Sequence, residues 1–105
     1  MMAGDIFVSD SLQWPANGSV FSWVLGFLTE ATTDPAVREE LEEIDEHNLG
    51  MLDLDSFAPP ARAELLTLLS ERLVPHAEAE LPPDVADRTG FLDELRTLAD
   101  MARSA

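Results

Sequence analysis

Apolar side chains surround almost the whole circumference of the segment from residue 20 to residue 31. Two adjoining stripes fall at helical spacing, the first being Phe21, Val24, Leu25 and Leu28 and the second Val20, Trp23, Phe27 and Ala31. A helix of this kind is stable only when other elements bury it on most sides. We therefore predict a central helix from Val20 to about Thr32, with Ser19 as its N-cap and Trp23 packed in the core.

A second helix is predicted directly after the first. Asp34 followed by Pro35 places a capping acid before a proline at the first helical position. The helix should run to about Asn48, since a glycine follows two residues later. Its narrow core-facing stripe consists of Val37, Leu41 and Ile44.

Two more helices are predicted in the second half of the chain. Pro59 and Pro60 open the first, which runs to about Val74 because Pro75 ends or kinks it. The second covers residues 91–102, and its earliest start is residue 85. Because the connections are short, neighbouring helices should be antiparallel.

The N-terminal segment is the part of the chain without a helical pattern. Ile6, Phe7 and Val8 form a β-prone run that predicts either a short strand or an extended arm. Pro15 disfavours a helix at Trp14. We therefore predict an all-α protein with one acidic domain over residues 1–105, consisting of an N-terminal arm (1–18) and a compact bundle of about four helices (19–105).

The charge balance excludes several classes of ligand. The chain has 21 acidic and six basic residues, all six of them arginine, which gives a formal net charge of −15. Phosphate recognition needs stripes of Lys and Arg, so we expect no binding to nucleic acid or to an anionic membrane. A basic protein is the class of partner that this charge favours.

The sequence also suggests where the protein acts. The longest apolar stretch, residues 20–28, is shorter than the roughly 20 residues that span a bilayer. The start of the chain has no basic stretch ahead of an apolar run, and there is no cysteine to form a disulfide. We expect a cytoplasmic protein, and the use of Arg without Lys beside abundant Ala and Leu is typical of a high-GC bacterial genome.

Acidic residues are concentrated between Glu30 and Asp55. This segment holds ten acids and one base, Arg38. When the apolar stripe of the second helix faces the core, four of the acids lie on the opposite face: Glu39, Glu42, Glu43 and Glu46. They form two like-charge pairs at i,i+4 spacing, each of which destabilises a helix by roughly 0.2–0.5 kcal/mol. Helix energetics do not explain this face, which is either a solvated surface or a docking surface for a basic partner.

No pattern of catalytic or metal-binding residues is present. His47 and His76 lie in separate segments, and the chain has neither a nucleophile elbow nor a glycine-rich phosphate loop. Asp45 and His47 would combine with acids that point outward from one exposed helix, whereas zinc ligands converge. Asp53 begins a calcium-loop pattern that fails at Ala58, where glycine is needed. We expect no enzymatic activity, no cofactor and no metal.

These observations predict a protein–protein binding module for a basic partner. Its most concrete form is an immunity protein or antitoxin that inhibits a nuclease-type toxin by placing carboxylates where phosphates would bind. The predicted partner-binding residues are Glu39, Glu42, Glu43, Glu46, Asp53, Asp55 and Trp14. Trp14 is either an apolar anchor for the partner or a cap on the core.

A structural or assembly protein is the alternative prediction. In this case the protein forms a homodimer through apolar surface and the N-terminal arm, and the acids only keep it in solution.

Overall fold

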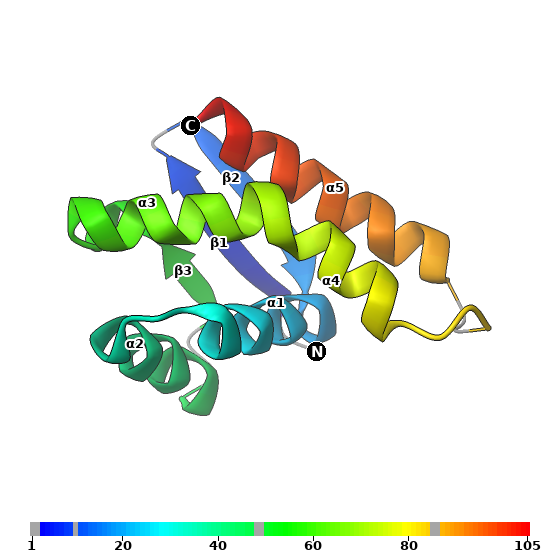
Figure 1. Cartoon of the computed structure of the whole chain (residues 1–105), viewed down its shortest axis with the longest axis horizontal. Helices are drawn as coiled ribbons and strands as arrows, with labels where there is room; N and C mark the ends of the chain where they lie inside the picture. The colour runs from blue at the N-terminus through cyan, green and yellow to red at the C-terminus, as the bar shows by residue number, and fades with distance from the viewer. Residues whose placement is uncertain (1–2, 10, 48–49, 85–86) are drawn as a thin grey trace.

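A three-stranded sheet forms the base of the molecule. The computed structural model describes residues 3–9, 11–47, 50–84 and 87–105. The middle strand is β1 (Ala3–Ser9), which pairs antiparallel with β2 (Leu12–Asn17) and parallel with β3 (Met51–Asp53). Figure 1 shows the helices lying across this sheet.

The predicted all-α class is therefore wrong, and the protein is a helix-rich mixed α/β structure. The residues predicted as an N-terminal arm form a β-hairpin in which Ile6 lies opposite Trp14 and Asp5 opposite Pro15. Pro15 is compatible with a strand here because β2 is at the edge of the sheet, where a missing N–H breaks no ladder. The third strand has only three residues and comes from the connection between two helices.

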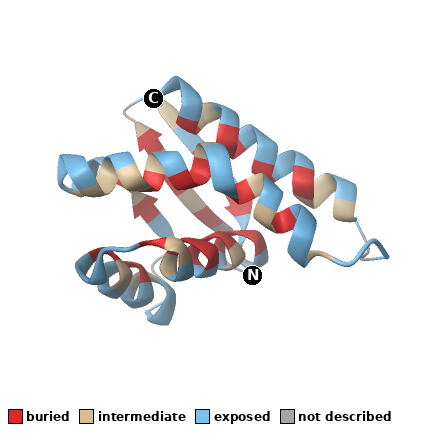
Figure 2. Cartoon of the chain, viewed as in Figure 1, coloured by how far each residue is buried: buried red, intermediate tan, exposed pale blue. Residues whose placement is uncertain are grey.

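One face of the sheet is buried and the other is more exposed. Along β1 and β2 the buried residues alternate with less buried ones, and the buried set is Gly4, Ile6, Val8, Trp14 and Ala16. This alternation is typical of a sheet covered by helices on one side only. The buried residues of the helices face the same interior (Figure 2).

The central helix α1 (Gly18–Ala31) begins two residues earlier than expected. Its N-cap is Asn17 and not Ser19, because the Asn17 side chain accepts a hydrogen bond from the Val20 N–H at 2.9 Å. Asn is as good an N-cap as Ser. The helix packs directly on β1, where a Cβ at Gly4 would lie 2.6 Å from the Cβ of Phe21.

Helix α2 (Pro35–Glu46) packs against α1 as its apolar stripe predicts. Val37 and Leu41 are buried, Ile44 is half-buried against the core, and Asp34 accepts a hydrogen bond from the Ala36 N–H at 2.9 Å. The predicted last residue, Asn48, lies outside the described residues.

The third predicted helix continues through Pro75. It consists of α3 (Pro59–Thr67), a wider π-helical turn η2 (Leu68–Arg72) and α4 (Leu73–Glu80). In a regular α-helix the Pro75 ring would collide with the carbonyl group four residues earlier. The wide turn lies directly before that point, and such turns are one way in which a helix accommodates a change in its hydrogen-bond pattern.

The last helix, α5 (Arg88–Ser104), lies beside α4 and over β2. Its buried stripe is Leu92, Leu95, Leu98, Ala99 and Ala102. The earliest predicted start, residue 85, falls outside the described residues. Among the helices of the described ranges, none is long and apolar enough to cross a membrane.

Candidate functional site

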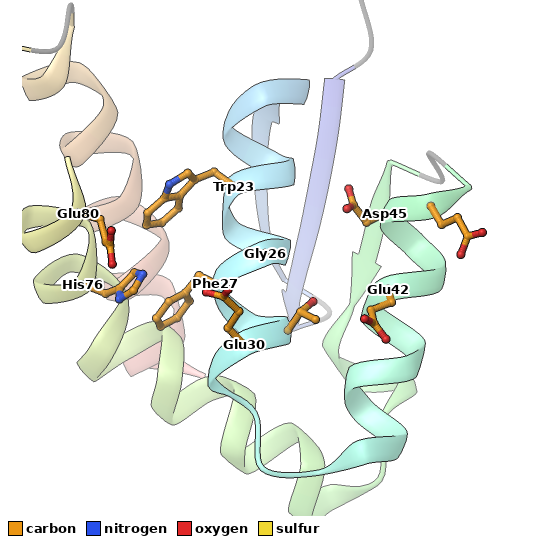
Figure 3. A pocket seen from close by; sticks show the side chains of 10 residues that line it. Trp23, Gly26, Phe27, Glu30, Glu42, Asp45, His76 and Glu80 are labelled. Carbon is orange, nitrogen blue, oxygen red and sulfur yellow. The ribbon is translucent and has the colours of Figure 1, made fainter. Parts of the chain in front are cut away.

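An open groove of about 870 Å³ crosses the outer face of α1 between α2 and α4. Helix α1 forms its floor with Trp23, Gly26, Phe27, Thr29 and Glu30. Figure 3 shows the two walls, α2 on one side of Gly26 and α4 on the other. The remaining lining residues are Glu42, Asp45 and Glu46 from α2 and His76 and Glu80 from α4.

Aromatic rings form the half of the groove nearer α4. The rings of Trp23 and Phe27 are parallel within 5°, with centroids 6.4 Å apart, as expected for neighbours at i,i+4 on one helix. His76 packs against both, with centroid distances of 5.9 Å to Trp23 and 5.0 Å to Phe27. Phe91 of α5 meets the Trp23 ring edge-to-face at 5.4 Å and fixes it from behind.

Five carboxylates also line the groove: Glu30, Glu42, Asp45, Glu46 and Glu80. None of them takes part in an ion pair with another described residue. None of the six arginines, all of which the structure describes, lines the groove. The groove is therefore a concentration of negative charge beside aromatic surface, and it favours a cationic ligand.

Arg38 is the single base of the acidic segment, and it forms no ion pair with a described groove acid. Its Nε donates a hydrogen bond to the Thr29 carbonyl oxygen at 3.0 Å, and its Nη2 donates to that of Thr32 at 2.8 Å. Both acceptors belong to the C-terminal end of α1, where a positive charge is favourable. Arg38 thus fixes α2 to α1 without neutralising the acidic face.

The structure divides the predicted acidic ridge of α2 into two parts. All four of its glutamates are exposed, but only Glu42 and Glu46 line the groove. Glu39 and Glu43 lie on the same helix outside the lining. Asp45, which was not among the predicted binding residues, belongs to the groove.

Asp53 and Asp55 do not extend this surface, because both make local contacts elsewhere. Asp53 caps the 3₁₀ turn η1 (Leu54–Ser56) by accepting a hydrogen bond from the Asp55 N–H at 3.0 Å. The Asp55 carboxylate pairs with Arg62 Nε at 2.9 Å, and Arg62 Nη2 also donates to the Val8 carbonyl oxygen at 3.2 Å. Arg62 thus attaches α3 to the sheet, and neither acid lines the groove.

Trp14 is part of the core and not an anchor on the surface. Its side chain is 2% exposed, and its indole Nε1 donates a hydrogen bond to the Glu94 carbonyl oxygen at 3.0 Å. The bond joins β2 to α5. Because the ring is buried, a partner cannot contact it in the folded protein. Of the two predicted roles, the geometry therefore supports the cap on the core.

Gly26 lies at the centre of the groove floor, and its position is unusual. It is exposed in the interior of α1, where glycine costs about 0.5–1 kcal/mol relative to alanine. No atom lies within 4 Å of the position that a Cβ would occupy. Packing therefore does not require glycine at this position, in contrast to Gly4.

Glu64 fixes the turn that connects the floor of the groove to its α2 wall. Its carboxylate accepts hydrogen bonds from the hydroxyl of Thr32, from the hydroxyl of Thr33 at 2.6 Å and from the Thr33 N–H at 3.2 Å. The Thr32 and Thr33 hydroxyls lower the pKa of Glu64 below its ordinary value of 4.5, while burial opposes them. Since Glu64 belongs to α3, this contact ties three helices together.

Of the five groove carboxylates, Glu42 and Glu46 were among the predicted binding residues, whereas the other three and the aromatic half of the groove were not. Trp23 was expected in the core, but it is half-buried and exposes part of its ring to the groove. His76 lies in a different segment from His47, and the structure packs it on two rings. The spacing of Trp23, Gly26 and Phe27 along one side of α1 was the available signal, because a glycine between two aromatic residues interrupts an otherwise apolar surface.

Metal ligands are not grouped in the part of the chain that the structure describes. Within residues 3–9, 11–47, 50–84 and 87–105, no three His, Asp or Glu side chains are close enough together to hold an ion. Comparison of the chain with protein-family models, with curated proteins and with solved structures finds no match.

Proposed function

We propose that this protein is a binding module for a basic protein partner and that the groove over α1 is its docking site. The observation that carries the proposal is the combination, in one open groove, of an aromatic floor and five carboxylates that form no ion pair with any described residue. Opposite charge raises association rates and selects partners. Aromatic surface supplies the apolar contact that charge alone lacks.

The arrangement supports binding better than catalysis. The imidazole of His76 lies against two aromatic rings, and the hydrogen bonds between described side chains pair it with no carboxylate. A general base in a catalytic pair needs such a partner to orient it. The groove offers acceptors and aromatic faces, which are the groups that recognise a cation.

In its most specific form, the proposal is that the partner is a nuclease-type toxin and that the protein is its immunity protein or antitoxin. A nuclease binds phosphates in a basic cleft. A surface that presents several carboxylates side by side can occupy that cleft and block it. A toxin-like reading frame directly upstream of the coding sequence would supply the partner for a direct test of inhibition.

A homodimer built through the N-terminal arm is the alternative, and the fold favours it less. Ile6 and Val8, which would form the apolar part of that arm, are fully buried under the helices. Among the described residues, Met51 is the one large apolar side chain that is exposed, at 53%. The surface therefore offers little apolar area for a second copy.

Two charge-matched double variants test the docking site. Glu42→Gln/Glu46→Gln removes two groove carboxylates, and Glu39→Gln/Glu43→Gln removes two from the same helix outside the groove. Each relieves one i,i+4 repulsion, so both should be slightly more stable than the wild type. The tagged proteins are used to capture basic proteins from lysate of the source cell at low salt, and the captured proteins are eluted by raising the salt.

The expected result is that the groove variant loses the captured protein and the control variant keeps it. An equal loss in both variants would show that overall acidity, and not this groove, attracts the partner. Capture that resists high salt would contradict a charge-driven docking site.

A further inference from the structure

Gly26 marks the place where a ligand would approach α1 most closely. The fold gains nothing from glycine here, since a Cβ would meet no atom within 4 Å. Because Gly26 has no side chain, the centre of the groove floor is open between the aromatic half and the α2 carboxylates (Figure 3). Glycine at such a position is expected where another chain comes close to the helix.

We infer that the groove receives an arginine side chain of the basic partner, which lies over Gly26 with its guanidinium group against the Trp23 ring and within the acidic lining of the groove. This inference rests on the proposed function and specifies its ligand. Glu80 and Glu42 belong to opposite walls, and Glu30 lies on the floor between them. The lining of the groove thus includes carboxylates from three helices.

Arginine fits these surroundings better than lysine does. Its planar group can stack on an aromatic face and still donate hydrogen bonds within its own plane to carboxylates. An ammonium group is more strongly hydrated and loses more on leaving water. The half-buried Trp23, held by Phe91 at 5.4 Å, provides a fixed aromatic surface for such stacking.

The two tryptophans allow a direct test in solution. The probes are hexa-arginine and hexa-lysine peptides, which carry equal charge, at one fixed ionic strength. The indole N–H signals of Trp23 and Trp14 are followed by ¹⁵N NMR, with Trp14 as the internal reference because it is buried and bonded to Glu94. We expect hexa-arginine to shift the Trp23 signal, to leave the Trp14 signal in place, and to bind roughly five- to thirty-fold more tightly than hexa-lysine.

A substitution at the floor completes the test. Gly26→Gln fills the centre of the groove with a neutral side chain, and Ser22→Gln places the same side chain on an exposed position of α1 outside the lining. Gly26→Gln should raise the melting temperature, since Gln is a better helix former than Gly. It should also weaken hexa-arginine binding at least about tenfold. Ser22→Gln should change that affinity by less than about twofold.

The outcomes separate this inference from the proposed function. Equal affinity for the two peptides, an unmoved Trp23 signal, or full binding by Gly26→Gln would each overturn the arginine site. If one of these results is found while partner capture still depends on Glu42 and Glu46, the docking proposal is unaffected. Loss of that dependence would overturn the docking proposal itself.

Discussion

Thr32 donates its hydroxyl hydrogen to the carboxylate of Glu64, a residue 32 positions further along the chain. Thr32 is 2% exposed and lies just after α1, and Glu64 lies in the second turn of α3. Together with two bonds from Thr33, this contact holds the α1–α2 turn against the third helix. The direction in which α2 leaves α1, and with it one wall of the groove, depends on this carboxylate.

Glu64→Gln should destabilise the protein by roughly 1.5–3 kcal/mol at neutral pH, the range for hydrogen bonds to a charged group. The lowered pKa means that the ionised form contributes stability above the unfolded-state value near 4.5. That contribution disappears as the pH falls through the folded-state pKa. Urea unfolding of both proteins between pH 7 and pH 3 should therefore show a stability difference that shrinks below pH 4.5. A constant difference would contradict the assignment.

Gly4→Ala should destabilise the fold by about 1–3 kcal/mol, because the new methyl group would overlap Phe21 where α1 packs on β1. Gly26→Ala is the matched control, in which the same methyl group enters open space on the exposed face of α1. It should stabilise the fold by about 0.5–1 kcal/mol. Thermal unfolding should show a lower melting temperature for Gly4→Ala and a higher one for Gly26→Ala than for the wild type. Melting temperatures that change in the same direction would argue against the packing described.

Trp14→Phe should cost about 1–3 kcal/mol, since it removes the bond to the Glu94 carbonyl and leaves space in the core. The affinity for a basic partner should not change, because the ring lies outside the groove. Chemical denaturation and the capture assay measure the two quantities separately. Weaker capture by a fully folded Trp14→Phe protein would restore the role of surface anchor.

Arg38→Ala should destabilise the protein by roughly 1.5–3 kcal/mol through loss of two charge-assisted bonds to the end of α1. Arg38→Lys keeps the charge but cannot reach both carbonyl groups with one nitrogen, so an intermediate loss is expected. Denaturant titration of the three proteins gives the order directly. If Arg38→Ala proved as stable as the wild type, the two bonds would not be holding α2 in place.

The helices could be predicted from local signals, and the sheet could not. Proline, capping acids and apolar spacing are contained within a few residues, so Asp34 and Pro35 place the start of α2 correctly. The strand β3 has three residues, and its partner Ile6 lies 46 positions away from Leu52. No local pattern encodes a pairing of that kind, and Pro15 of β2 indicated only that Trp14 is not helical.

The candidate site was predicted to the same extent and for the same reason. Charge is visible in the sequence, so Glu42 and Glu46, which line the groove, were among the predicted binding residues. Which side of an almost wholly apolar helix stays uncovered depends on tertiary packing, so Trp23 and Phe27 were not. The position of α4, which brings His76 onto these rings, follows from a helix that continues through Pro75.

The parallel pairing of β1 with β3 has a consequence for how α2 is held. Arg38 and the turn that Glu64 binds fix the N-terminal end of α2. Four residues beyond its C-terminal end, where β3 begins, the Asp5 N–H donates a hydrogen bond to the Gly50 carbonyl oxygen at 2.9 Å. A helix restrained on both sides has little orientational freedom left to lose. A partner would therefore meet a rigid, preformed wall, and the entropy of association would be spent on the partner's own side chains.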